Sequence, residues 1–137
     1  MRLFNPQSRL RGQGIVEFAL VLPIFLLLTL GTVELGWLVY SNHTLTNATR
    51  EGARFAMVHG ERSGDVANAT TVNEVVVDRA GHLGGNIDST LVSFSPDAEP
   101  GSEVTVQSTY DYQPLVGMMV GVDPMTLTSE TTVIVQY

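Results

Sequence analysis

One long apolar stretch constrains this chain more than any other feature of its sequence. Residues 12–40 read GQGIVEFALVLPIFLLLTLGTVELGWLVY, and no charged residue falls within the part from Phe18 to Val33. At about 1.5 Å of rise per residue, the roughly 25 residues of segment 15–40 form a helix long enough to cross a hydrocarbon core about 30 Å thick. The sequence therefore predicts a membrane-spanning helix over residues 13–40.

Two carboxylates interrupt the apolar stretch. A carboxylate inside lipid costs about 2.5–3.5 kcal/mol on insertion scales, so each one requires an explanation. Glu34 lies near the far end, where Trp37 and Tyr40 are expected as interfacial anchors and where its carboxylate can reach the lipid headgroups. Glu17 lies near the start, five residues after Gly12.

A short basic segment, residues 1–12, precedes the span. It contains no acidic residue, Pro6 disfavours a continuous helix within it, and its three arginines are Arg2, Arg9 and Arg11. Because basic residues beside a span favour the cytoplasmic side, we expect the N-terminus in the cytoplasm and the rest of the chain outside. A conventional secretory signal is the competing interpretation, but it would have a shorter apolar core followed by a small-x-small cleavage site. Here YSNH follows at residues 40–43.

Two motifs of the first sixty residues are specific when taken together. The first is RGQGIVEFALVLP at residues 11–23, and the second is NATREGARFA at residues 47–56. Both resemble motifs of the TadE-like pseudopilins, which are minor pilins of the Tad or Flp (type IVb) pilus system. Family members have a short basic leader, a glycine at the cleavage point, a glutamate at the fifth mature position and an apolar helix.

The resemblance implies that a prepilin peptidase cleaves after Gly12, so that the mature chain begins at Gln13. It places Glu17, Phe18 and Pro23 in the part of the helix that packs against neighbours during assembly. In a filament, the Glu17 carboxylate can pair with the new N-terminal amine of an adjacent subunit, and each charge then offsets the desolvation of the other. The alternative is that Glu17 only marks the water-side end of a membrane helix.

The composition excludes several classes of function. The chain has 137 residues and no cysteine, which predicts one small domain without disulfides or zinc–thiolate sites. Its formal net charge is −7, and removal of the three leader arginines leaves four arginines against fourteen acidic residues, or −10. Nucleic-acid binding is not expected because phosphate contacts require a basic face. Residues 41–137 are expected to form an acidic domain outside the cytoplasmic membrane.

The membrane helix is expected to continue into this outer domain. Apolar and small residues recur at three- and four-residue steps and so share one helix face; they are Leu45, Ala48, Gly52, Phe55 and Ala56. Arg50, Glu51 and Arg54 lie on polar faces, with Glu51 within reach of Arg54. Either these residues pair within a solvated helix or the arginines contact an acidic site on the next subunit. Gly60 and the pair at 63–64 are expected to end the helix.

The rest of the chain predicts a second helix and a small antiparallel sheet of about three strands. The helix is expected over residues 65–80, capped by Ser63 or Asp65 and closed by glycines, with Leu83 turned back against the core. Period-two alternation predicts strands over 91–94, 104–112 and 125–137. The fold class is therefore α+β and pilin-like, with a long N-terminal transmembrane helix.

An apolar connection, QPLVGMMVGVDP at residues 113–124, joins the last two expected strands. Such a segment is either folded into the core or exposed as a contact site, and the flexible thioethers of Met118 and Met119, with Leu115, suit an adaptable contact. Family members similarly have an apolar segment with proline and leucine here. Ile134 interrupts the polar face of the last strand and can meet a partner.

The titratable side chains form no catalytic constellation. His43, His59 and His82 lack metal-ligand spacing, and nucleophile-elbow, phosphate-loop and zinc-protease motifs are missing from the sequence. The acidic residues of loop 97–103 can in principle gather around calcium, although a solvated loop is the commoner outcome. We therefore expect no enzyme activity, no cofactor and no metal.

We thus expect a structural subunit or assembly factor of an adhesive Tad pilus, serving surface colonisation. Its expected partners are prepilin peptidase, other pilin subunits, the inner-membrane assembly platform and membrane lipid. The alternative is a single-pass anchored binding or scaffold domain that never polymerises.

Overall fold

The computed structural model describes residues 7–136, and within them the side chains of residues 13–83, 86–87, 90–119 and 121–136. The elements follow in the order α1 (Gln7–Val58), η1 (Glu61–Ser63), α2 (Ala69–Ala80), η2 (Gly81–Asn86), β1 (Ile87–Ser95), β2 (Glu103–Tyr112), α3 (Leu115–Val120) and β3 (Met125–Ile134). The predicted α+β class, with a long helix, a second helix and a small antiparallel sheet, is confirmed. Residues 1–6 of the expected leader, and Tyr137 of the expected last strand, lie outside the described residues.

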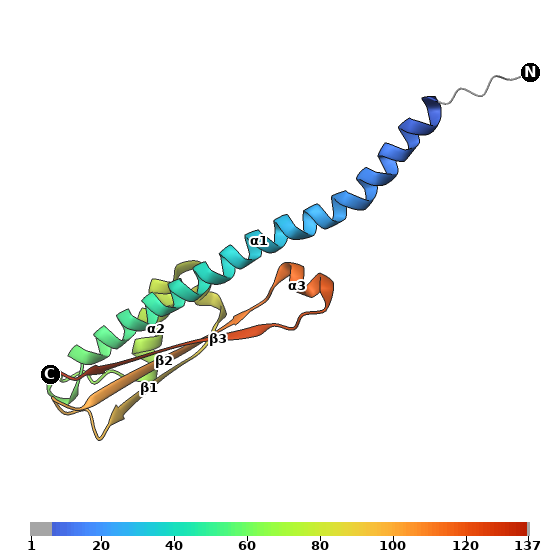
Figure 1. Ribbon diagram of the computed structural model, residues 1–137. Coiled ribbons are helices and arrows are strands. Elements are labelled where there is room, and N and C mark those ends of the chain that lie inside the picture. Colours follow the sequence, from blue (N-terminus) through green and yellow to red (C-terminus); the bar gives the residue numbers. More distant parts are fainter. Residues whose placement is uncertain (1–6, 137) are drawn as a thin grey trace, which may run out of the picture.

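The long helix α1 has two different halves. Its second half lies along α2 and the sheet, whereas its first half projects away from the folded domain (Figure 1). Within residues 13–136, the first buried side chain is that of Ser41. The helix runs through Pro23 without interruption, and its blue part bends gently in Figure 1, as the missing N–H of a proline allows.

The second half of α1 buries the face that its periodicity predicts. Leu45, Ala48, Gly52 and Ala56 are buried and Phe55 is half-buried. The small residues allow a close approach, because a Cβ atom at Gly52 would lie only 2.6 Å from Val76 Cγ2 of α2. Helix α1 ends at Val58, just before Gly60, as expected.

The second helix begins at Ala69, so the predicted start at residue 65 and the predicted caps were wrong. Asn68 is the N-cap instead: its side chain accepts hydrogen bonds from the Thr70 and Thr71 N–H groups, at 2.8 and 3.0 Å. The Thr71 hydroxyl in turn accepts from the Asn68 N–H, so all three of these N–H groups are paired. This capping box stabilises the start of the helix at Ala69. Leu83 is buried after the helix, as predicted.

The sheet is an antiparallel meander in the order β1-β2-β3, with β2 at its centre. The alternation predicted for β2 is confirmed, because every second residue is buried against the helices: Val104, Val106, Ser108, Tyr110 and Tyr112. The first strand is longer than predicted and begins at Ile87. The opposite face is more polar and carries a Thr105–Thr132 hydroxyl hydrogen bond of 2.8 Å.

The connection between β2 and β3 contains a short helix, α3, that the sequence did not predict. Pro114 precedes it as the N-cap residue, and Gly121 ends it in the left-handed conformation at φ 80°. In Figure 1 this connection lies at the end of the sheet from which the first half of α1 projects.

Candidate functional site

The first half of α1 presents its apolar side chains to the surroundings. It is the one helix among the described residues that is long and apolar enough to cross a membrane, and none of its most apolar window is buried within the protein. Phe18 and Pro23 lie in this unburied half. A monomer in water would expose this whole surface, so length, composition and exposure together indicate a single-pass membrane anchor.

The expected processing residues, Gly12 and Gln13, lie near the start of α1. One turn further on, Glu17 is exposed, and its Oε1 atom accepts a 3.4 Å hydrogen bond from the Gln13 side-chain amide. No buried partner holds this carboxylate among the side chains that the structure describes. The roles of these residues in cleavage and assembly stay predictions.

Glu34 has a partner that sequence reasoning missed. Its two carboxylate oxygens accept the Val116 N–H of α3, at 3.2 and 3.0 Å. The N-cap residue Pro114 makes no side-chain capping bond, so Glu34 supplies the acceptor from α1. A carboxylate at a helix N-terminus is favoured by the orphan N–H groups and by the helix dipole. Glu34 thus fastens α3 to the long helix rather than only reaching for headgroups.

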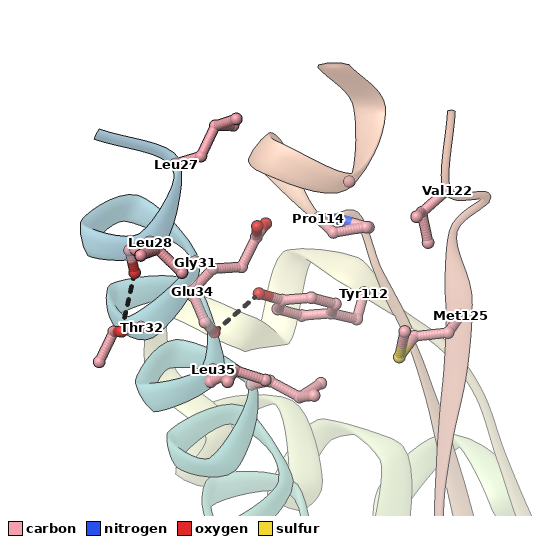
Figure 2. A pocket seen from close by; sticks show the side chains of 12 residues that line it. Leu27, Leu28, Gly31, Thr32, Glu34, Leu35, Tyr112, Pro114, Val122 and Met125 are labelled. Carbon is pink, nitrogen blue, oxygen red and sulfur yellow. Dashed lines mark hydrogen bonds between the residues drawn. The ribbon is translucent and has the colours of Figure 1, made fainter. Parts of the chain in front are cut away.

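Tyr112 reinforces this junction from β2. Its hydroxyl donates a 3.3 Å hydrogen bond to the backbone oxygen of Glu34, which Figure 2 shows beside the Glu34 side chain. Burial raises the pKa of the Tyr112 phenol, and the negative charge of Glu34 raises it further, followed by that of Tyr110. The phenol therefore stays a neutral donor at physiological pH.

Two apolar hollows flank the Glu34 junction. The first has a volume of about 420 Å³ and lies between Leu27, Leu28 and Gly31 of α1 and residues on the other side that include Pro114 and Val122 (Figure 2). The second has a volume of about 380 Å³, and its lining side chains include Leu30 and Val33 on one side and Leu115 and Met119 on the other. Glu34 and Tyr112 are the titratable residues in the lining of each hollow, and the other lining residues are mostly apolar.

The expected contact loop is exposed rather than folded into the core. Leu115, Met118 and Met119 are 80%, 69% and 79% exposed, while Pro114 and Gly117 are the buried members of the segment. The local signal for α3 was weak, because a six-residue helix with two glycines nearby has no clear period. The sequence contains a carboxylate inside one apolar stretch and a proline-led apolar segment elsewhere, but no signal that joins the two.

The three expected helix-interaction residues do not act as a group. Arg50 and Arg54 are exposed, and the described ion pair of Glu51 is with Arg79 of α2, at 3.5 Å, rather than with Arg54. Between these charged residues, Thr49, Gly52 and Ala53 are buried against the rest of the domain. Much of the second motif therefore serves close helix packing, and contact of its arginines with another subunit stays a prediction.

His82 and the acidic loop make local structural contacts. His82 stacks on Tyr40 with ring centroids 5.5 Å apart and lies 5.3 Å from Trp37, so the two expected interfacial aromatics also meet the folded domain. Asp97 accepts hydrogen bonds from the Ser102 hydroxyl at 2.7 Å and from the Glu99 N–H at 3.1 Å. Within the part of the chain that the structure describes, no three potential ligands gather around a common metal position.

Comparison with known proteins gives one result. A family model described as TadE-like protein matches residues 12–54, which span the expected cleavage point, the apolar half of α1 and most of the second motif. No curated protein and no solved structure matches the chain. Over residues 12–54 of its 137, the chain is therefore similar to TadE-like proteins, and this match supports an association with Tad pilus systems.

Proposed function

We propose that this protein is a TadE-like minor pilin, a structural subunit or assembly factor of a Tad (Flp, type IVb) pilus used in adhesion and surface colonisation. One observation carries the proposal: a single continuous helix is the spine of the folded domain over its second half and is unburied and apolar over its first half. Such a helix can exchange lipid for neighbouring helices without refolding the domain. The role is structural and not enzymatic.

The proposed assembly step begins with cleavage by prepilin peptidase after Gly12. The new amine at Gln13 then meets the Glu17 carboxylate of a neighbouring subunit, which sets the register between helices. Because lipid is as apolar as the helices, shape complementarity and this charge pair must drive the exchange. The hydrogen bond from the Gln13 side chain leaves the second Glu17 oxygen available for the amine.

The proposed location is the bacterial cytoplasmic membrane, with the N-terminus in the cytoplasm and the acidic domain outside. The arginines of residues 1–12 support this orientation. The proposed partners are prepilin peptidase, the other pilin subunits and the inner-membrane assembly platform. The TadE-like match supports contact with Tad pilus components.

The decisive experiment is the intact mass and N-terminal sequence of the protein recovered from membranes, with and without the cognate prepilin peptidase. We expect a start at Gln13 that requires the peptidase and is lost in Gly12→Leu. Gly36→Leu is the matched control, because a Cβ atom at Gly36 meets nothing within 4 Å and lies far from the cut. An intact leader in both strains would contradict processing and favour a permanently anchored binding domain.

A second experiment separates assembly from processing. Glu17→Gln keeps the shape of the side chain and removes its charge, so we expect normal cleavage and membrane insertion but loss of the protein from sheared filaments. Glu74→Gln, on the exposed side of α2, is the control. Glu17→Gln protein in filaments at the normal level would refute the charge-pair step.

A further inference from the structure

The β2–β3 connection ends in an apolar surface that the folded domain leaves uncovered. We call residues 113–122 the apolar tip; it contains no charged residue and is bounded by Asp111 and Asp123. Beside the exposed amide of Gln113, four of its exposed side chains are large and apolar: Leu115, Met118, Met119 and Val122. An exposed apolar surface of this kind is typical of a site that contacts protein or lipid.

The apolar tip lies beside the part of α1 that must be inside a membrane. Leu27, Leu30 and Val33 line the two hollows that the tip helps to close. A span needs about 20 residues, and every window of that length within the apolar run 15–40 contains segment 27–33. The tip therefore sits at the depth of membrane-embedded residues wherever the span is placed.

Several backbone N–H groups of the apolar tip are hydrogen-bonded within the protein, as an environment without water demands. In hydrocarbon, each unpaired N–H group costs several kcal/mol. Four of its N–H groups are paired within the protein: Val116 to Glu34, Met118 to Pro114, and both Gly121 and Val122 to Gly117. Pro114 contributes no N–H at all. The Glu34 carboxylate, costly if isolated in lipid, is bonded to the same short helix.

We propose that the apolar tip inserts into the leaflet next to the folded domain and contacts lipid acyl chains beside α1. The occupant is lipid because the tip continues the lipid-facing surface of the span at the same depth. The outer domain is then attached to the membrane at two points, which fixes its rotation about α1. This proposal requires that α1 crosses a membrane, and it does not depend on a role in a pilus.

The test uses the absence of cysteine from the chain. Single variants of the full chain carry an environment-sensitive fluorophore and are reconstituted into phosphatidylcholine vesicles containing some phosphatidylglycerol and acyl-chain nitroxide quenchers. Met118→Cys reports on the tip, and Phe25→Cys reports on the span. Ile134→Cys is the matched control, because Ile134 is also a large apolar residue, 60% exposed, and pairs with Glu103 at the opposite end of the sheet.

We expect blue-shifted emission and strong quenching at Met118→Cys, comparable to Phe25→Cys and several-fold greater than at Ile134→Cys. The quenching should not change as the protein-to-lipid ratio is lowered. Leu115→Cys repeats the measurement in case one tip variant disturbs folding, which far-ultraviolet circular dichroism monitors.

Two outcomes would overturn the proposal. Tip probes that behave like Ile134→Cys while Phe25→Cys is quenched would show a span without tip insertion. Tip probes that are shielded from the quenchers only at high protein density would show that a second copy, and not lipid, covers the tip. Neither outcome would bear on cleavage after Gly12, so failure of this proposal is distinguishable from failure of the pilin role.

Discussion

Glu34 shows how one hydrogen bond can satisfy two groups that each need a partner. It lies in an apolar helix, where a free carboxylate is costly, and it is also the acceptor that the N-terminus of α3 lacks. The hydrogen bond from the Val116 N–H to the Glu34 carboxylate offsets both the cost of a free carboxylate and the cost of an unpaired N–H group. Asp97 acts in the same way in the β1–β2 connection, where it accepts two hydrogen bonds that hold the turn.

Glu34→Ala should weaken the attachment of α3 without unfolding the domain. Loss of a helix cap costs about 1 kcal/mol, which corresponds to roughly fivefold faster exchange of a locally protected amide. We expect this increase at the Val116 amide, measured by hydrogen exchange in detergent micelles. Glu74→Ala, an exposed glutamate on α2, should leave that amide unchanged. An unaltered Val116 exchange rate in Glu34→Ala would show that the cap contributes nothing.

Asp97 should titrate at unusually low pH. The Ser102 hydroxyl, and then the Glu99 N–H, lower the pKa of Asp97 from its ordinary value of 3.8 by bonding to the charged form. Because the pKa is lower in the folded state, its stabilising contribution is present above the unfolded value and is lost as pH falls through the folded value. Ser102→Ala should move the NMR midpoint of Asp97 upward, whereas Ser93→Ala should not. Identical midpoints in all three proteins would exclude the hydroxyl as the cause.

The second half of α1 is an example of an element whose small residues matter more than its charged ones. Gly52 faces α2 at a distance that leaves no room for a methyl group, and Val106 of β2 is also close to it. The neighbouring charged residue Glu51 pairs with Arg79 of the same α2 helix. The position of α2 on α1 therefore depends mainly on the close approach at Gly52, because an exposed ion pair contributes little to stability.

Gly52→Ala should destabilise the domain. Overpacking costs about 1–3 kcal/mol against a gain of about 1 kcal/mol in helix propensity, so we expect a net loss of about 1 kcal/mol in the free energy of unfolding. Chemical unfolding followed by circular dichroism measures it. Gly36→Ala is the control, since its Cβ atom would meet nothing within 4 Å.

A double-mutant cycle identifies the cause of that loss. The clash is with the stiff side chain of Val76, so Gly52→Ala combined with Val76→Ala should be less destabilised than the sum of the two single variants. Strict additivity would show that Val76 is not the residue that Gly52 accommodates.

The whole molecule divides into a folded domain and a projecting helix, joined at the point where burial begins. The hydrophobic core consists of residues between Leu45 and Val135, with Ser41 as the first buried residue in the described chain. The contacts between α1 and α3 lie outside this core. They involve residues of α1 that precede Ser41, at Glu34 and around the two hollows. We therefore expect the core to form without the span and the apolar tip to lose its position without it.

A fragment of residues 41–137 should fold cooperatively and keep α2 and the three-stranded sheet. Its α3 amides should exchange faster than in the full chain, because Glu34 and the apolar side chains of segment 27–33 are gone. Hydrogen exchange resolved by residue compares the two proteins. A fragment that fails to fold, or one whose α3 amides stay protected, would show that the boundary at residue 41 is wrong.

The sequence was sufficient to predict an element wherever the periodicity or composition of that element decides its structure. The apolar run of α1 was predictable from its length and composition. The buried face of α1 from Leu45 to Ala56 and the alternation of β2 were predictable because each pattern repeats within a few residues. The start of α2 was missed because several residues near it can cap a helix, and Asn68 is the one that completes a reciprocal bond with Thr71.

Only the tertiary structure decided which residues far apart in the sequence contact one another. Glu34 and Val116 are separated by 82 positions, and neither residue's neighbours in sequence indicate the other. The same holds for Glu51 and Arg79, and for Gly52 and Val76, whose contacts depend on how α2 lies against α1. Periodicity states which face of an element is apolar, but the identity of what covers that face depends on the relative placement of elements, which no local repeat encodes. The apolar tip next to the span is the clearest product of that placement.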